Sequence, residues 1–146
     1  MNGPFWHLLI NHIPVVGLPF VLVLLLLAWS WKSEDLAKVA YGGLVVIALA
    51  TFLSDQTGDS AAEVASSIPT ISAEAIPPHE QAAGQAVIST IILGVLGIAG
   101  LVFFRQSRRW IVICTVGAFL VSLQLARVAH LGGLIRHPEV QFTRTP

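Results

Sequence analysis

Five histidines are the side chains of this sequence best suited to bind a cofactor, and each lies beside an apolar segment. They are His7, His12, His79, His130 and His137. Neutral imidazole is the common protein ligand for haem iron, copper and zinc. Acidic side chains occur in the same polar stretches, so the sequence offers either a histidine-only site or a mixed site of imidazole and carboxylate.

A b-type haem is the first interpretation of these histidines. The candidate ligands are His12, His79, His130 and His137, and the candidate partners of the propionates are Arg127 and Arg136. Ala82, Ala83 and Ala86 would leave room for a flat ring near His79. The alternative for these small residues is close helix packing, which is their usual role in membrane helices.

A polar stripe runs along the last apolar segment. Gln124, Arg127 and His130 recur at i, i+3 and i+6, so they drift slowly around one helix face. Ionisable groups at membrane depth usually face the interior of a bundle, where Arg127 could pair with a propionate, Asp55 or Glu80. The alternative is that Arg127 extends to the headgroups, which a position near the helix end allows.

A mixed metal site is the second interpretation. Its candidate ligands for iron, manganese or zinc are His7, His12, His79, His130, His137, Glu63, Glu80 and Glu139. No HExxH or CxxC pattern fixes such a site, and the single cysteine, Cys114, excludes an internal disulfide. No nucleophile–base pair or phosphate loop is visible either, so we expect a non-catalytic subunit rather than an enzyme.

Four apolar segments must position these residues. The chain is 55% hydrophobic and only 11% charged, whereas about 25% is usual in soluble domains. The segments predict helices over 12–31, 36–54, 78–105 and 109–131, each long enough to cross a core of about 30 Å. They lack the alternation of barrel strands, so only helices satisfy their backbone in lipid. We therefore predict one all-α domain, residues 1–146, folded as a four-helix transmembrane bundle. A net charge of zero gives no reason to expect a nucleic-acid partner.

The basic residues predict the orientation of this bundle. Lys32 and Lys38 lie between the first two helices, and Arg105, Arg108 and Arg109 lie between the last two. Cytoplasmic loops carry the excess of lysine and arginine, so these turns are predicted to face the cytoplasm. Both termini, all five histidines and the long loop between the second and third helices then face a periplasm.

That long loop, residues 54–81, is predicted to carry one or two short helices on the outer surface. Pro77-Pro78 marks the entry to the third helix, because proline is tolerated in a first turn. At the other end of the chain, Gly132-Gly133 predicts a helix C-cap followed by a tight turn. Such a turn would fold Arg136, His137 and Glu139 back over the mouth of the bundle.

The motifs in these polar stretches form a set. They are Asn11-His12-Ile13-Pro14, Thr57-Gly58 with Ala62-Glu63, His79-Glu80 with Ala82-Ala83, and Leu131-Gly132-Gly133 with Ile135-Arg136-His137-Pro138-Glu139. The set covers nearly the whole chain and resembles an uncharacterised family of small bacterial four-helix membrane proteins. This family is close to a domain-of-unknown-function group with a histidine and proline opening motif. Relatives of the wider group occur joined to, or encoded beside, c-type cytochrome modules, so the resemblance implies redox work without assigning ligands.

The expected function is therefore a subunit of the bacterial inner membrane that binds b-type haem near the periplasmic face. It would pass electrons between a quinone and another redox subunit such as a c-type cytochrome. Two alternatives stay open. One is a cofactor-free subunit that anchors a larger membrane complex, and the other is a membrane protein with a site of histidine and glutamate for a transition metal.

Overall fold

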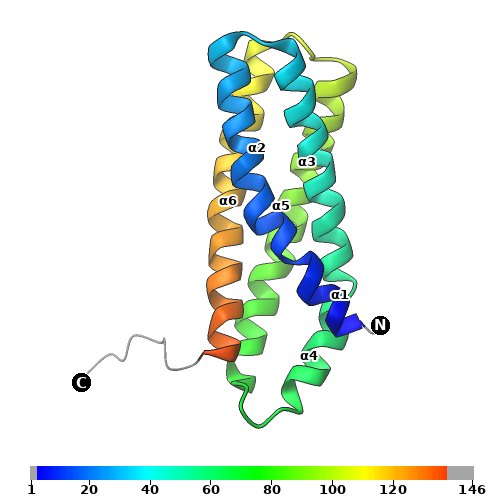
Figure 1. The fold of residues 1–146 in the computed structure, drawn as a ribbon, viewed down its shortest axis with the longest axis vertical. Helices are drawn as coiled ribbons and strands as arrows, with labels where there is room; N and C mark the ends of the chain where they lie inside the picture. The colour runs from blue at the N-terminus through cyan, green and yellow to red at the C-terminus, as the bar shows by residue number, and fades with distance from the viewer. Residues whose placement is uncertain (1–2, 138–146) are drawn as a thin grey trace, which may run out of the picture.

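Four long helices run side by side along the whole molecule in the computed structural model, which describes residues 3–137 (Figure 1). They are α2 (His12–Trp31), α3 (Glu34–Asp55), α5 (Ile76–Val102) and α6 (Arg108–Arg136). Three shorter elements complete the described range: α1 (Gly3–Ile10), α4 (Gly58–Ser66) and the 3-10 turn η1 (Ala73–Ala75). No strand occurs between residues 3 and 137, so the predicted all-α fold is confirmed.

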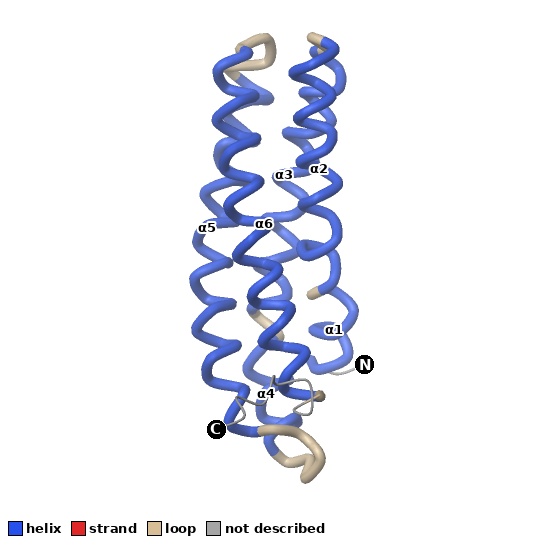
Figure 2. Tube along the Cα trace, turned by 90° about the vertical axis from the view of Figure 1, so that its left-hand side faces the viewer, coloured by secondary structure: helices blue, strands red, loops and turns tan. Residues whose placement is uncertain are grey.

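The four long helices alternate in direction, and each packs against two others. Helix α2 contacts α3 and α6, and α5 contacts the same two from the opposite corner. All four are long and apolar enough to cross a membrane, so the chain is a multi-pass membrane protein. Two tight turns, residues 32–33 and 103–107, close what we call the hairpin end, at the top of Figure 2. Helices α1 and α4 lie at the opposite end, called here the histidine end.

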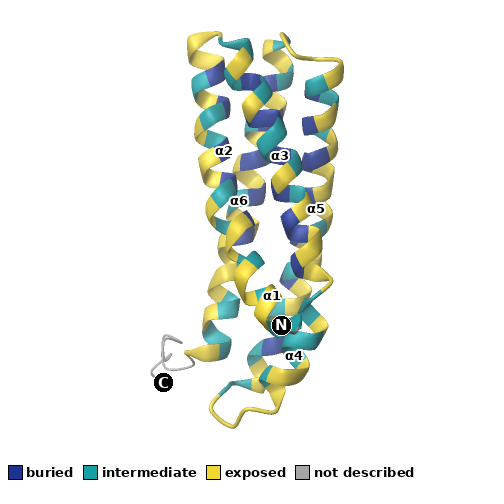
Figure 3. Cartoon of the chain, turned by 45° about the vertical axis from the view of Figure 1, so that its right-hand side comes forward, coloured by how far each residue is buried: buried dark blue, intermediate teal, exposed yellow. Residues whose placement is uncertain are grey.

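Buried side chains line the axis of the bundle, and large apolar side chains cover its outside (Figure 3). This distribution is typical of a membrane bundle, because lipid tails solvate apolar side chains as well as a protein core does. The closest packing joins α3 to α5. Gly97 of α5 faces the carbonyl oxygen of Tyr41, only 2.8 Å from where a Cβ of residue 97 would lie. Gly94 and Gly100 approach α3 in the same way, so small residues here serve helix packing.

Short polar side chains begin the two helices that leave the hairpin end. The hydroxyl of Ser33 accepts the backbone N–H of Leu36 at 3.3 Å, and Ser107 accepts that of Trp110 at 3.3 Å. Each hydroxyl satisfies one of the amide groups that a helix start leaves unpaired. Lys32 takes a left-handed conformation (φ 54°) and closes α2. Two of the four long helices thus begin at a serine cap, where two tight turns reverse the chain.

The first predicted helix is preceded by a helix that the sequence did not lead us to expect. Helix α1 ends at Ile10, and α2 starts two residues later at His12. Pro14 has no amide hydrogen, so the carbonyl of Ile10 has no partner in the helical ladder, and the chain bends there. The bend directs α1 onto α4 and the end of α3.

The prediction that Gly132-Gly133 ends the last helix was wrong. Helix α6 continues through both glycines to Arg136, and His137 is its C-cap. A glycine is required at position 132 by packing and not by a turn. A Cβ at this position would lie 3.1 Å from Cε1 of His79. The glycine therefore allows a close approach of α5 and α6 rather than a turn. Glu139, which the turn was expected to fold back, lies outside the described residues.

Candidate functional site

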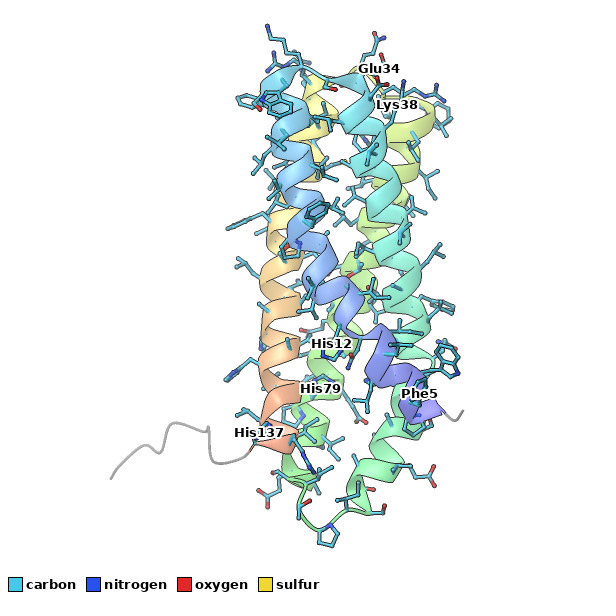
Figure 4. The ribbon with its side chains drawn as sticks, in the orientation of Figure 1. Phe5, His12, Glu34, Lys38, His79 and His137 are labelled. Atoms are coloured by element: carbon cyan, nitrogen blue, oxygen red, sulfur yellow. The ribbon has the colours of Figure 1, made fainter. Side chains whose placement is uncertain are left out.

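The histidine end carries all five histidines, as the alternating direction of the helices requires. His7 lies in α1, His12 starts α2, His79 lies in the first turn of α5, and His130 and His137 lie at the end of α6. His12, His79 and His137 follow one another down the long axis toward the histidine end (Figure 4). The five histidines therefore share one end of the molecule. Which of them can bind the same ligand depends on where each ring lies.

His79 is the histidine on the inner face of α5. It lies one helical repeat before the buried Ala82 and Ala86, and its own side chain is half-buried. Its Nδ1–H donates to the carbonyl oxygen of Val128 at 3.1 Å, which joins α5 to α6. The ring also lies against Gly132, where a side chain would displace it. His79 is thus held on two sides by α6.

His7 approaches the same region from α1. Its Nδ1–H donates to the carbonyl oxygen of Ser54 at 2.9 Å, and the Thr57 hydroxyl lies 3.5 Å from the same nitrogen. These contacts join α1 to the end of α3. The bend at Pro14 is what brings His7 to this position.

The hydrogen bonds of these rings fix their tautomers. A carbonyl oxygen can only accept, so Nδ1 carries a hydrogen in His7 and His79, and in the neutral form of each ring Nε2 has the lone pair. Histidines that bind metals usually donate their other ring N–H in this way, because the bond orients the ring and raises its basicity. His12 has the same arrangement through the carbonyl of Leu8 at 2.9 Å, but its ring is exposed.

Several residues expected at the site lie on the outer surface of the histidine end instead. Arg127 and His130 are exposed, and Arg127 forms no ion pair with Asp55 or Glu80 within residues 3–137. The prediction that Gln124, Arg127 and His130 face the interior of the bundle is therefore wrong. The inner face of α6 passes through Val121 and Leu125, and Arg127 lies about 200° around the helix from Leu125.

Two of the three acids proposed for the mixed metal site are exposed, and the third, Glu139, lies outside the described residues. Glu63 lies exposed on α4, and Glu80 is exposed on α5. Arg136 is exposed in the last turn of α6. Within the described part of the chain, no three side chains of His, Cys, Asp or Glu come together as metal ligands.

Some partners at this end had no recognisable sign in the sequence. Ser54 and Val128 contribute only backbone carbonyl oxygens, which any residue could supply. The side-chain oxygen of Asn11, beside the bend, is buried without a hydrogen-bond partner. Gly132 is the exception, because a glycine within a helix signals a close approach. The Gly132-Gly133 pair predicts a helix end from sequence, whereas in the structure Gly132 marks a close contact with His79.

Comparison of the chain with protein-family models, with curated proteins and with solved structures gives no match. The resemblance to the uncharacterised bacterial family stays a prediction.

Proposed function

We propose that this protein is an electron-transfer subunit that binds one b-type haem at the histidine end, with His79 as an axial ligand. The observation that carries the proposal is the Nδ1–H bond from His79 to the Val128 carbonyl, which leaves Nε2 as a lone-pair donor on the inner face of α5. Haem iron bound by histidine exchanges single electrons, and the surrounding protein tunes its potential.

His7 is the second proposed ligand. It donates Nδ1–H to a backbone carbonyl as His79 does, and it comes from a different element at the same end of the molecule. Ligands from separate helices are the usual way in which a bundle holds a cofactor. Arg136 lies one turn beyond Gly132 and is the arginine we propose for a propionate. Of the original ligand candidates, His12, His130 and His137 are exposed and receive no role in this proposal.

The proposed setting is the bacterial inner membrane with the histidine end in the periplasm. The hairpin end carries five of the eight basic residues, which favours its location in the cytoplasm. Electrons would then pass between a quinone in the bilayer and a periplasmic redox protein such as a c-type cytochrome. Both partners are part of the proposal.

An optical spectrum of the detergent-purified protein, oxidised and then reduced, tests the haem. The informative variants are His79→Asn and His7→Asn, because the Asn amide can replace Nδ1–H toward the carbonyl while Nε2 is removed. We expect both to lose the Soret band and remain folded. His12→Asn and His130→Asn are matched controls at exposed positions and should keep it. Full haem content in His79→Asn would exclude His79 as a ligand.

A cofactor-free anchor subunit is the second candidate, and one observation favours it. The bonds of His7 and His79 each tie two elements together, α1 to α3 and α5 to α6, which is sufficient reason for a histidine at either position. This function predicts a colourless protein in which His79→Asn is as stable as wild type and His79→Ala is less stable. It also predicts that a periplasmic protein copurifies with the histidine end.

A further inference from the structure

The opposite end of the molecule holds a groove that neither proposed function uses. It has a volume of about 350 Å³ and lies along α2 and α6 on the outside of the bundle, lined by Trp29, Arg108, Arg109, Val112 and Ile113. Its walls are mostly apolar, and two guanidinium groups stand where it meets the hairpin end. An apolar groove with cations at the membrane boundary has the chemistry of a lipid site.

Arg108 is held in place at this groove. Its Nη2 donates to the Trp29 carbonyl at 3.2 Å, and its guanidinium lies 5.2 Å from the centre of the Trp29 ring. The carbonyl belongs to the last turn of α2, where helix carbonyls lack partners of their own. One of five N–H donors is used in this bond, so the others can still bind an anion.

Arg109 supplies a cation without a partner in the described residues. The two acids of the hairpin end, Glu34 and Asp35, are already engaged by Lys38 at 3.1 Å and 3.3 Å. Glu34 also accepts the Gln106 side-chain amide at 3.0 Å. Within the described residues neither acid forms an ion pair with Arg108 or Arg109, so both arginines can bind an anion from outside the chain.

We infer that this groove binds an acidic phospholipid, with its phosphodiester between Arg108 and Arg109 and an acyl chain along Val112 and Ile113. The apolar walls identify the occupant as a lipid, since a free phosphate would gain nothing from them. The charge selects an acidic headgroup over a zwitterionic one. A planar guanidinium binds phosphate oxygens with two N–H groups at once, which makes arginine well suited to this position.

Native mass spectrometry of the detergent-purified protein tests the site, with phosphatidylglycerol and phosphatidylcholine added separately. We expect one phosphatidylglycerol to bind in preference to phosphatidylcholine. Arg109→Gln should weaken phosphatidylglycerol binding about fivefold, the effect of about one basic residue at a lipid surface. Arg105→Gln is the matched control, since it removes the same charge from the same end but does not line the groove.

A second variant tests the apolar part without changing the charge. Val112 is 44% exposed, so Val112→Trp should fold and fill the groove. We expect it to lower phosphatidylglycerol binding while glycerol phosphate, which has no acyl chains, fails to compete in wild type. Equal losses in Arg105→Gln and Arg109→Gln would overturn the site, as would unchanged binding in Val112→Trp. Competition by glycerol phosphate would show a phosphate site in place of a lipid site.

Discussion

The contact between His79 and Gly132 fixes how the outer turns of α5 and α6 meet. His79 reaches the Val128 carbonyl only because the helix surface at Gly132 leaves space for its ring. Glycine within a helix lowers its stability by about 0.5–1 kcal/mol relative to alanine. The loss is offset here by a hydrogen bond between helices, which gives Gly132 a packing role that its neighbour Gly133 lacks.

Gly132→Leu should therefore destabilise the protein by about 1–3 kcal/mol, because its side chain must displace the His79 ring. If the proposed haem is present, its absorption should fall in parallel. Gly133→Leu is the control, since nothing lies within 4 Å of a Cβ at that position. Thermal unfolding in detergent, followed by circular dichroism, measures both. Equal stability of the two variants would show that α6 does not press on His79.

In the middle of the bundle, Tyr41 has a buried polar group that forms no hydrogen bond within the described residues. This group is its hydroxyl, and the side chain is fully buried against Gly100. An unpaired buried hydroxyl costs about 1–3 kcal/mol. Tyr41→Phe should therefore raise the stability by about 1 kcal/mol, whereas Tyr41→Ala should lower it by about 3–5 kcal/mol through a cavity. A marked loss of stability in Tyr41→Phe would reveal a partner for the hydroxyl.

At the scale of the helices, α3 and α5 share the most extensive contact among the described elements. Without a hydrophobic driving force between helices in lipid, association depends on close packing, which small residues permit. Gly97 lets the backbone of α5 approach the Tyr41 carbonyl and the Cβ of Leu44. Gly94 and Gly100 also face residues of α3, so all three glycines of this seam serve helix packing.

Gly97→Leu should separate α3 from α5 and cost about 2 kcal/mol or more, because backbone atoms cannot move aside as side chains can. Gly84→Leu makes the same change on the same helix at a position with nothing within 4 Å of a Cβ. It should leave the unfolding temperature unchanged or raise it. Unfolding of purified variants in one detergent provides the comparison, and a similar loss in both would contradict the close packing of this seam.

The sequence predicted the elements better than their ends. Composition and segment length were sufficient for four spanning helices, and Pro77-Pro78 correctly marked the start of α5. Helix α1 was not predicted because the eight mostly apolar residues Gly3–Ile10 are too few to span a membrane and are separated from the first long segment by Asn11-His12. The end of α6 was missed because glycine serves both helix caps and close contacts, and only the position of His79 distinguishes the two. The site was predicted as a layer of histidines, but not which of them face inward.

The molecule as a whole is longer than a membrane is thick. Helix α6 has 29 residues, so at about 1.5 Å per residue it extends about 43 Å against a hydrocarbon core of about 30 Å. Tryptophans at the hairpin end, among them Trp29 and Trp31, are typical of one interface. If the hairpin end lies at that interface, the last turns of α6 extend beyond the core.

Cysteine labelling tests the orientation of this arrangement. Ser66→Cys lies in the exposed last turn of α4, and Gln106→Cys lies in an exposed hairpin turn. A membrane-impermeant maleimide applied to spheroplasts should label the first and not the second until the membrane is disrupted. Wild type is a suitable control, since its single cysteine, Cys114, is buried. Labelling of Gln106→Cys alone would invert the proposed topology.

The long apolar helices also determine what cannot cross the molecule. No Asp, Glu, Lys, Arg or His occurs in residues 13–31, 39–54, 81–104 or 110–126. Two threonines within these ranges, Thr51 and Thr90, are buried. Each donates to a carbonyl of its own helix, so they form no chain of hydrogen bonds. A proton or ion that reached this middle zone would lose its hydration without meeting a relay. The middle of the bundle therefore offers no Asp, Glu, Lys, Arg or His side chain as a relay between the two ends.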